Sequence, residues 1–129
     1  MVPMNFAYVP GDGPASGAGA PPGRLVFHTG PGRKSAALEL DPYVCVAVTA
    51  DETFVQGPSP CEDGFSFRSV LLEGRARRLE EPADRDRALR ALVAKHDPEG
   101  VTKPFDEAVL ARTLVYALPI ETLSYRERH

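Results

Sequence analysis

Two adjacent cations, Arg33 and Lys34, follow the glycine-rich turn Gly30-Pro31-Gly32 and stand at the start of a predicted helix. Glycine lets the backbone approach a ligand closely, and a helix N-terminus carries about half a unit of positive charge. An arginine can bind two phosphate oxygens at once, and a lysine adds a compact point charge. The stretch is therefore suited to binding a phosphomonoester. The alternative is a surface loop whose cations are merely solvated.

The first half of the chain supplies the elements that position this pair. Residues 2–9 and 24–28 are predicted strands, and the intervening residues 10–23, rich in Gly, Ala and Pro, are a predicted mobile connection. Residues 32–40 predict one or two turns of helix, ending before Asp41-Pro42. Residues 43–50 are apolar at both alternating sets of positions, which predicts a strand covered on both faces.

The second half predicts longer elements. Residues 65–79 are long for one strand, and Gly74 near their middle is where the strand would bend from one sheet into another. Residues 82–96 predict an amphipathic helix beginning at Pro82, and 105–112 a second short helix. Residues 113–125 predict a final strand, in which Pro119 indicates an edge or a bulge. About five strands with two or three helices indicate a mainly β, antiparallel barrel or sandwich in a single domain.

Composition excludes several function classes. The 129-residue chain is 43% hydrophobic and 26% charged with a net charge of −3, and it offers no sustained basic face to nucleic acid. It contains no secretion signal and no apolar run of about 18 residues, so no membrane partner is expected. Cys45 and Cys61 lack metal-ligand spacing and are predicted to be reduced thiols, which indicates a cytoplasmic protein without a metal site.

Four segments, in this order, resemble the flavin-binding split-barrel family related to pyridoxamine 5'-phosphate oxidase, in its nitroimidazole-reductase-like branch. They are residues 2–8, 25–48, 65–81 and 114–126. The resemblance implies an antiparallel split β-barrel with two or three peripheral helices. It also implies FMN as the cofactor and a homodimer that binds the cofactor at the subunit interface.

The resemblance implies a role for each segment. The Met4-Asn5 backbone would lie along the flavin ring, and Arg33 and Lys34 would bind its phosphate. The full implied cofactor-binding set is Met4, Asn5, His28, Thr29, Arg33, Lys34, Arg68 and Ser69. Among these, Thr29 would donate its hydroxyl. His28 would lie near the ring and is a weak candidate for catalysis, although a histidine hydrogen-bonded to backbone explains it equally well.

Three functions stay open on the sequence. The first is an FMN-dependent oxidoreductase that passes electrons from NAD(P)H to a small acceptor such as a nitro compound or a quinone. The second is a flavin-binding module without catalysis, because no residue is an unmistakable acid, base or nucleophile. The third is a split-barrel homodimer that binds no cofactor or a deazaflavin, because the same architecture hosts different ligands, including haem.

Overall fold

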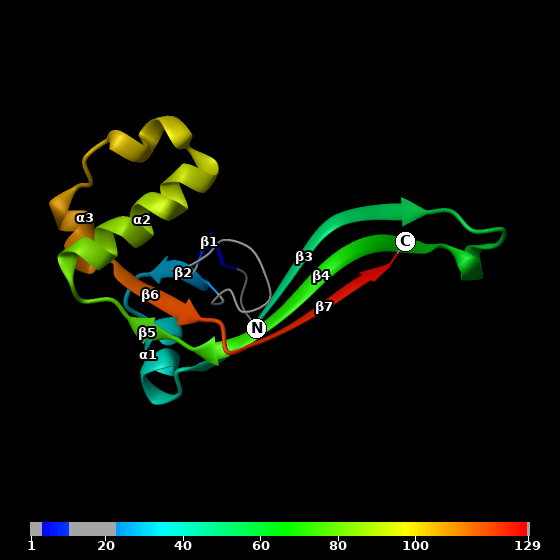
Figure 1. The fold of residues 1–129 in the computed structure, drawn as a ribbon, viewed down its shortest axis with the longest axis horizontal. Coiled ribbons are helices and arrows are strands. Elements are labelled where there is room, and N and C mark those ends of the chain that lie inside the picture. Colours follow the sequence, from blue (N-terminus) through cyan, green and yellow to red (C-terminus); the bar gives the residue numbers. More distant parts are fainter. Residues whose placement is uncertain (1–3, 11–22, 129) are drawn as a thin grey trace.

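Two antiparallel sheets form the framework of the molecule, which we describe from a computed structural model covering residues 4–10 and 23–128. The first sheet has the order β1-β2-β6-β5 and forms the body of the molecule (Figure 1). Its strands are β1 (Ala7–Val9), β2 (Arg24–Thr29), β6 (Leu114–Pro119) and β5 (Arg77–Arg78). The predicted mobile connection, residues 10–23, lies almost wholly outside the described residues.

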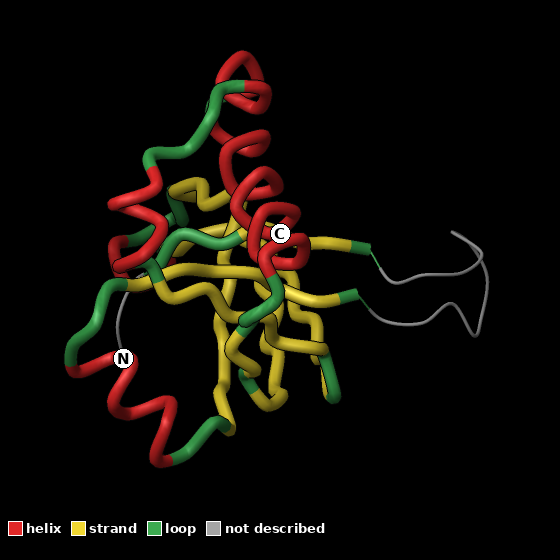
Figure 2. Tube along the Cα trace, turned by 90° about the vertical axis from the view of Figure 1, so that its left-hand side faces the viewer, coloured by secondary structure: helices red, strands yellow, loops and turns green. Residues whose placement is uncertain are grey.

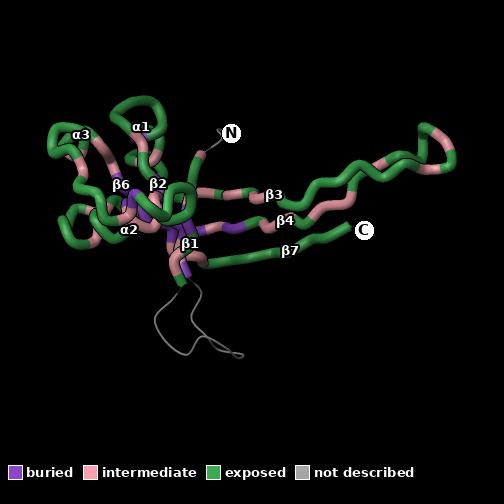
Figure 3. Tube along the Cα trace, turned by 90° about the horizontal axis from the view of Figure 1, so that it is seen from above, coloured by how far each residue is buried: buried purple, intermediate pink, exposed green. Residues whose placement is uncertain are grey.

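The second sheet extends away from the body as an elongated ribbon, which we call the arm (Figure 1). It has the order β3-β4-β7, with β3 at Tyr43–Val55, β4 at Gly64–Arg75 and β7 at Thr122–Arg128. Figure 3 shows that buried residues concentrate in the body, whereas most of the arm is exposed. The fold is thus mainly β with two antiparallel sheets, consistent with a split barrel. Within the described residues the sheets do not close into a barrel.

Three helices pack around the body sheet, as Figure 2 shows from the side. They are α1 (Arg33–Leu40), α2 (Pro82–His96) and α3 (Glu107–Arg112), with short 3-10 turns at Pro60–Glu62 and Pro98–Thr102. The bounds of α2 confirm the sequence prediction, whereas α1 begins one residue later than predicted and α3 begins two residues later. None of the helices in the described part of the chain is long and apolar enough to cross a membrane.

Both faces of the body sheet are buried, each against a different helix. On one face, Val26 and Val115 pack against Leu89 and Leu92 of α2. The opposite face forms a second cluster, in which the strand residues Leu25, Phe27, Tyr116 and Leu118 meet Leu72 of β4. Leu38 of α1 also packs against this second cluster. The alternation of buried side chains therefore fixes α1 and α2 on opposite sides of one sheet.

Two predictions about strands were wrong in the first half of the chain. Of the strand predicted over residues 2–9, residues 2 and 3 lie outside the described residues, residues 4–6 precede the strand, and Ala7–Val9 pair with β2. The strand predicted to be covered on both faces is β3, whose Tyr43, Cys45 and Ala47 are exposed. Nothing in the described chain packs on that face, so its apolar side chains remain exposed.

The predicted bend near Gly74 is confirmed, because the chain leaves the arm after β4 and enters the body sheet as β5. A Cβ on Gly74 would lie 2.3 Å from the carbonyl oxygen of Pro119, so glycine permits this close approach. The final predicted strand was wrong as a single element. It divides at Pro119 into β6 and β7, which lie in different sheets. Pro119 ends β6, a strand between β2 and β5, and does not mark a sheet edge.

Candidate functional site

The start of α1 is built by the turn that precedes it. The Ser35 hydroxyl accepts a hydrogen bond from the Gly32 amide at 2.9 Å and donates to the Gly32 carbonyl at 2.9 Å. Ser35 is buried, whereas Gly30 and Gly32 have open space where a Cβ would stand. These bonds fix the direction in which the helix begins. The first amides of the helix have no intrahelical acceptor and remain directed out of its N-terminal end.

Arg33 and Lys34 are both exposed at this end of α1. The first turn of the helix contains no acidic residue, and neither cation forms an ion pair with any residue in the described ranges. The two cations and the helix dipole therefore add up to an unneutralised positive end, which favours an anion.

Thr29 and His28 end β2, just before this turn. Thr29 lies opposite Leu114 and its hydroxyl donates to the Gly30 carbonyl at 3.2 Å. His28 is exposed and lies two residues after Val26, which packs on α2, so alternation along β2 places His28 on the α2 side and Thr29 on the α1 side. Of the two, Thr29 shares the side of the sheet with the cations.

Met4 and Asn5 approach the same end of the body. Because β1 runs antiparallel to β2 with Ala7 opposite Val26, the chain before Ala7 runs toward the Thr29 end of β2. Met4 is half-buried against the cluster that includes Phe27, and Asn5 is exposed. The predicted ring-contacting segment and the predicted phosphate-binding pair therefore both lie toward this end of β2.

Arg68 and Ser69 occupy a different part of the molecule, the outer half of the arm. They pair with Glu127 and Arg126 near the end of β7, which Figure 1 marks C, whereas α1 lies at the far side of the body. As neighbours on one strand they project from opposite faces. Only one of them can therefore line any single face of the arm, and within one subunit neither belongs to the site at α1.

Arg68 is held by a residue that the sequence did not indicate. The Asp51 carboxylate accepts a hydrogen bond from the Arg68 Nε at 2.6 Å and also forms an ion pair with the guanidinium. This hydrogen bond, followed by the charge of Asp51, raises the pKa of Arg68 above its ordinary value. No local pattern could have revealed the pair, because the contact joins two strands.

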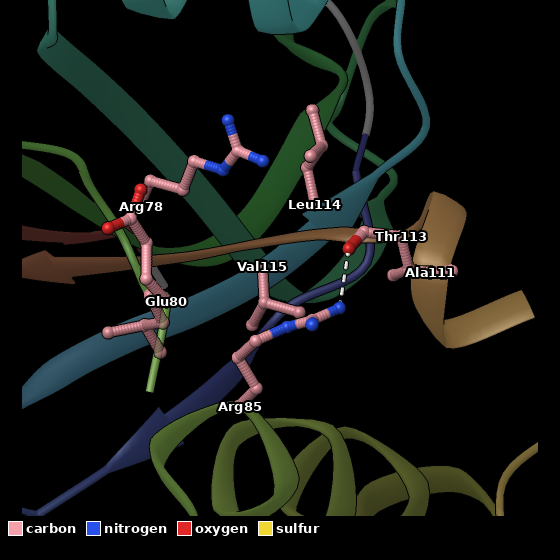
Figure 4. A pocket seen from close by; sticks show the side chains of 8 residues that line it. Arg78, Glu80, Arg85, Ala111, Thr113, Leu114 and Val115 are labelled. Carbon is pink, nitrogen blue, oxygen red and sulfur yellow. Dashed lines mark hydrogen bonds between the residues drawn. The ribbon is translucent and has the colours of Figure 1, made fainter. Parts of the chain in front are cut away.

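Arg33 and Lys34 line neither of two cavities in the described part of the chain. One, of about 280 Å³, is apolar and lies between body and arm, because it is lined by body residues such as Phe6 and Tyr8 and by arm residues such as Val70 and Leu123. Phe6 and Tyr8 are close to the predicted ring-contacting segment. The other, of about 270 Å³, lies where β5 ends beside β6 (Figure 4). There Arg85 donates to the carbonyls of Leu110 and Thr113 at 2.6 and 2.8 Å, and so caps the end of α3. We assign this arginine a structural role.

Comparison with solved structures identifies similar folds. A candidate 5-nitroimidazole antibiotic resistance protein from Bacteroides thetaiotaomicron matches at 20% identity and a TM-score of 0.70, covering 96% of this chain and 66% of that chain. The flavocytochrome Anf3 from Azotobacter vinelandii matches at 24% and 0.69, covering 98% and 63%. An FAD- and haem-binding protein from Mycobacterium smegmatis matches at 26% and 0.72, covering 98% and 66%.

The chain thus spans about two thirds of the length of these three proteins. A search of curated proteins gives no match. The family model of pyridoxamine 5'-phosphate oxidase matches residues 1–127, nearly the whole sequence. The chain therefore belongs to the pyridoxamine 5'-phosphate oxidase family.

Proposed function

We propose that this protein binds FMN, with the phosphate at the start of α1, and serves as an NAD(P)H-dependent oxidoreductase of a small acceptor, a nitro compound or a quinone. When bound, the flavin supplies the redox chemistry by accepting and returning two electrons. The chain's own residues hold the cofactor. Arg33 and Lys34 bind the phosphate, Thr29 donates its hydroxyl, and the Met4-Asn5 backbone borders the ring.

The observation that carries this proposal is the unneutralised positive end of α1. Its two cations have no carboxylate partner among the described residues, and the adjoining Gly30 and Gly32 leave room for an anion to approach the backbone. This donor set suits a phosphate dianion, which gains most from charge-assisted hydrogen bonds. The names of the flavocytochrome and of the FAD- and haem-binding protein support a flavin as the ligand that carries the phosphate.

We further propose a homodimer with the cofactor between subunits. Apolar side chains are open on both faces of the arm: Leu71, 41% exposed, lies on one face, and Leu123 and Tyr125, 60% and 54% exposed, lie on the other. A second copy that covers the arm would bury this apolar surface. Such a copy could also bring its own Ser69 or Arg68 to a cofactor held at α1. The free Cys45 and Cys61 thiols support our proposal that the dimer acts in the reducing cytoplasm.

Equilibrium binding tests the cofactor assignment. The purified protein is titrated with FMN, FAD and riboflavin, and the bound ligand is identified after heat release. We expect about one FMN per subunit. In the double variant Arg33→Ala/Lys34→Ala, FMN affinity should fall at least about a hundredfold, to that of riboflavin, because charge-assisted bonds are lost. Unchanged FMN affinity in this variant would overturn the phosphate site. Tighter binding of FAD than of FMN, or release of a deazaflavin or haem on heating, would show that the ligand is not FMN.

A non-catalytic flavin-binding module is the second candidate function, and one observation favours it. His28, the weak catalytic candidate, lies on the α2 side of the body sheet, opposite the side that carries Thr29 and α1. Oxidation of NADPH or NADH by the FMN-loaded protein, with menadione or a nitroimidazole as acceptor, separates the two functions. Turnover supports the oxidoreductase, and tight FMN without turnover supports the module.

A further inference from the structure

Lys95, in the last turn of α2, holds the chain at Phe6 through two contacts. Its ammonium donates a hydrogen bond to the Phe6 carbonyl oxygen at 2.8 Å, and it lies 3.6 Å from the centre of the Phe6 ring. A cation over an aromatic face is attracted by the ring's quadrupole. One side chain thus fixes both the backbone and the ring of the same residue, 89 positions away in sequence.

The segment that Lys95 holds has little sheet pairing of its own. Pairing between β1 and β2 begins at Ala7, and residues 4–6 precede the strand. Ala7 anchors the following chain, because it packs in the cluster formed with α2. Before Ala7 the main chain depends on other contacts, and the Lys95 hydrogen bond supplies one of them. Its loss would leave the backbone of Met4 and Asn5 freer to move.

We propose that Lys95 is a positioning residue for the flavin, an inference that rests on the function proposed above. Met4 and Asn5, the residues proposed to border the flavin ring, lie two positions and one position before Phe6. Because Lys95 holds Phe6 against α2, it fixes the position of the Met4-Asn5 backbone relative to the flavin ring. It acts through Phe6 and touches no proposed phosphate ligand. Replacing Lys95 should therefore weaken the binding of the flavin ring and leave the phosphate contacts unaltered.

This separation of ring from phosphate defines the test. The variant Lys95→Met keeps an unbranched apolar stem but lacks the donor and the charge. It should weaken the binding of riboflavin and of FMN by the same factor, about tenfold, as expected for a lost charged hydrogen bond that acts indirectly. The visible circular dichroism of bound FMN should also change, because it reports the surroundings of the ring. Lys95→Arg should retain most of the affinity.

Two further variants control the experiment. Lys103→Met removes a lysine whose side chain makes no hydrogen bond or ion pair with the described residues, and it should leave both affinities unchanged. Phe6→Leu removes the ring beneath the ammonium but keeps the carbonyl acceptor, and it should give a smaller, equally shared loss. This second variant keeps the proposal testable if Lys95→Met fails to fold.

Each outcome is decisive. Equal losses for riboflavin and FMN, with an unchanged Lys103→Met control, support the positioning role. Riboflavin affinity within twofold of wild type in Lys95→Met overturns it, and so does a loss confined to FMN, which would indicate direct phosphate contact. If wild-type protein binds neither flavin, the proposed function fails and the inference falls with it. If the wild-type protein binds flavin and Lys95→Met binds it with the same affinity, only the inference is overturned and the proposed function stands.

Discussion

The carboxylate of Asp51 reaches the guanidinium of Arg68 because a β-bulge interrupts β3 between Ala50 and Thr53. Ala50 lies directly opposite Arg68 and shares its face of the arm, so regular alternation would place residue 51 on the other face. At the bulge Asp51 takes a left-handed conformation with φ at 57°. The bulge thus turns this side chain back toward Arg68.

The conformation of Asp51 predicts an unusual response to substitution. Asp51→Gly should change the free energy of unfolding by less than about 1 kcal/mol, because glycine adopts a positive φ without steric cost. Asp51→Val should lower it by about 2 kcal/mol, since a β-branched residue is strained there. Urea denaturation measures both. Glu52→Val, in the same bulge, is the control, and equal losses for the two valine variants would argue against a left-handed residue 51.

Charge on the open arm should prevent self-association. Leu71 is 41% exposed on β4, and Leu71→Glu should convert a dimer to a monomer in light scattering coupled to size exclusion, because a buried unpaired carboxylate is costly. Val109→Glu is the matched control, since Val109 is 50% exposed but lies on α3. A wild-type protein that is already monomeric, or a Leu71→Glu variant that stays dimeric, would contradict this use of the arm.

The crossing of Gly74 and Pro119 should tolerate no side chain. In Gly74→Val the new Cβ would stand 2.3 Å from the Pro119 oxygen and 3.2 Å from the Leu118 side chain. We expect a loss of about 2 kcal/mol or more in the free energy of unfolding, without a matching loss in flavin affinity of the folded protein. Gly30→Ala, where no atom lies within 4 Å of the added methyl, should be close to neutral. An equally stable Gly74→Val protein would exclude this packing.

The Tyr43 hydroxyl should lose its proton at a higher pH than an ordinary tyrosine does. Its pKa is raised above 10.0, first by the hydrogen bond that its hydroxyl donates to Glu73 at 2.6 Å and then by partial desolvation and the charge of nearby carboxylates. Because the folded pKa exceeds the unfolded one, this contribution to stability is complete below about pH 10 and disappears as pH rises through the folded pKa. Glu73→Gln should lower the pKa of Tyr43 toward its ordinary value.

Phenolate absorbance, taken as the difference from a Tyr43→Phe variant, measures that titration. Glu121→Gln is the control, because Glu121 raises the pKa of Tyr43 through charge alone and less than Glu73 does. A shift in Glu121→Gln as large as that in Glu73→Gln would mean that the hydrogen bond is not the main cause.

Local signals predicted the parts of the fold whose causes are local. Pro82 at the start of α2 and Asp97-Pro98 after its end gave the helix bounds, and the turn before Arg33 gave α1. The split of the last predicted strand at Pro119 was not predictable. It depends on β6 and β7 joining different sheets, and a sheet partner is a long-range property.

The candidate site follows the same rule. Thr29, Arg33 and Lys34 are close in sequence, so a single turn brings them together and the sequence could group them. The resemblance also implied Arg68 as a ligand of the same cofactor, but β4 places Arg68 on the arm, away from α1. The partners Asp51 and Lys95 join distant segments, and neither stands in a motif that could have indicated its contact.

The exposed arm should also unfold locally more easily than the body. Over most of the length of the arm no other element of the described chain covers either face, so its backbone hydrogen bonds lack the apolar burial that protects those of Val115 and Leu118 in β6. Such a ribbon can open as a cooperative unit of its own, at a lower free energy than the body. In an isolated subunit the amides of β3 and β7 would then exchange with solvent long before those of β6. Association of two subunits through the arm would slow amide exchange in β3 and β7 toward the rate in β6.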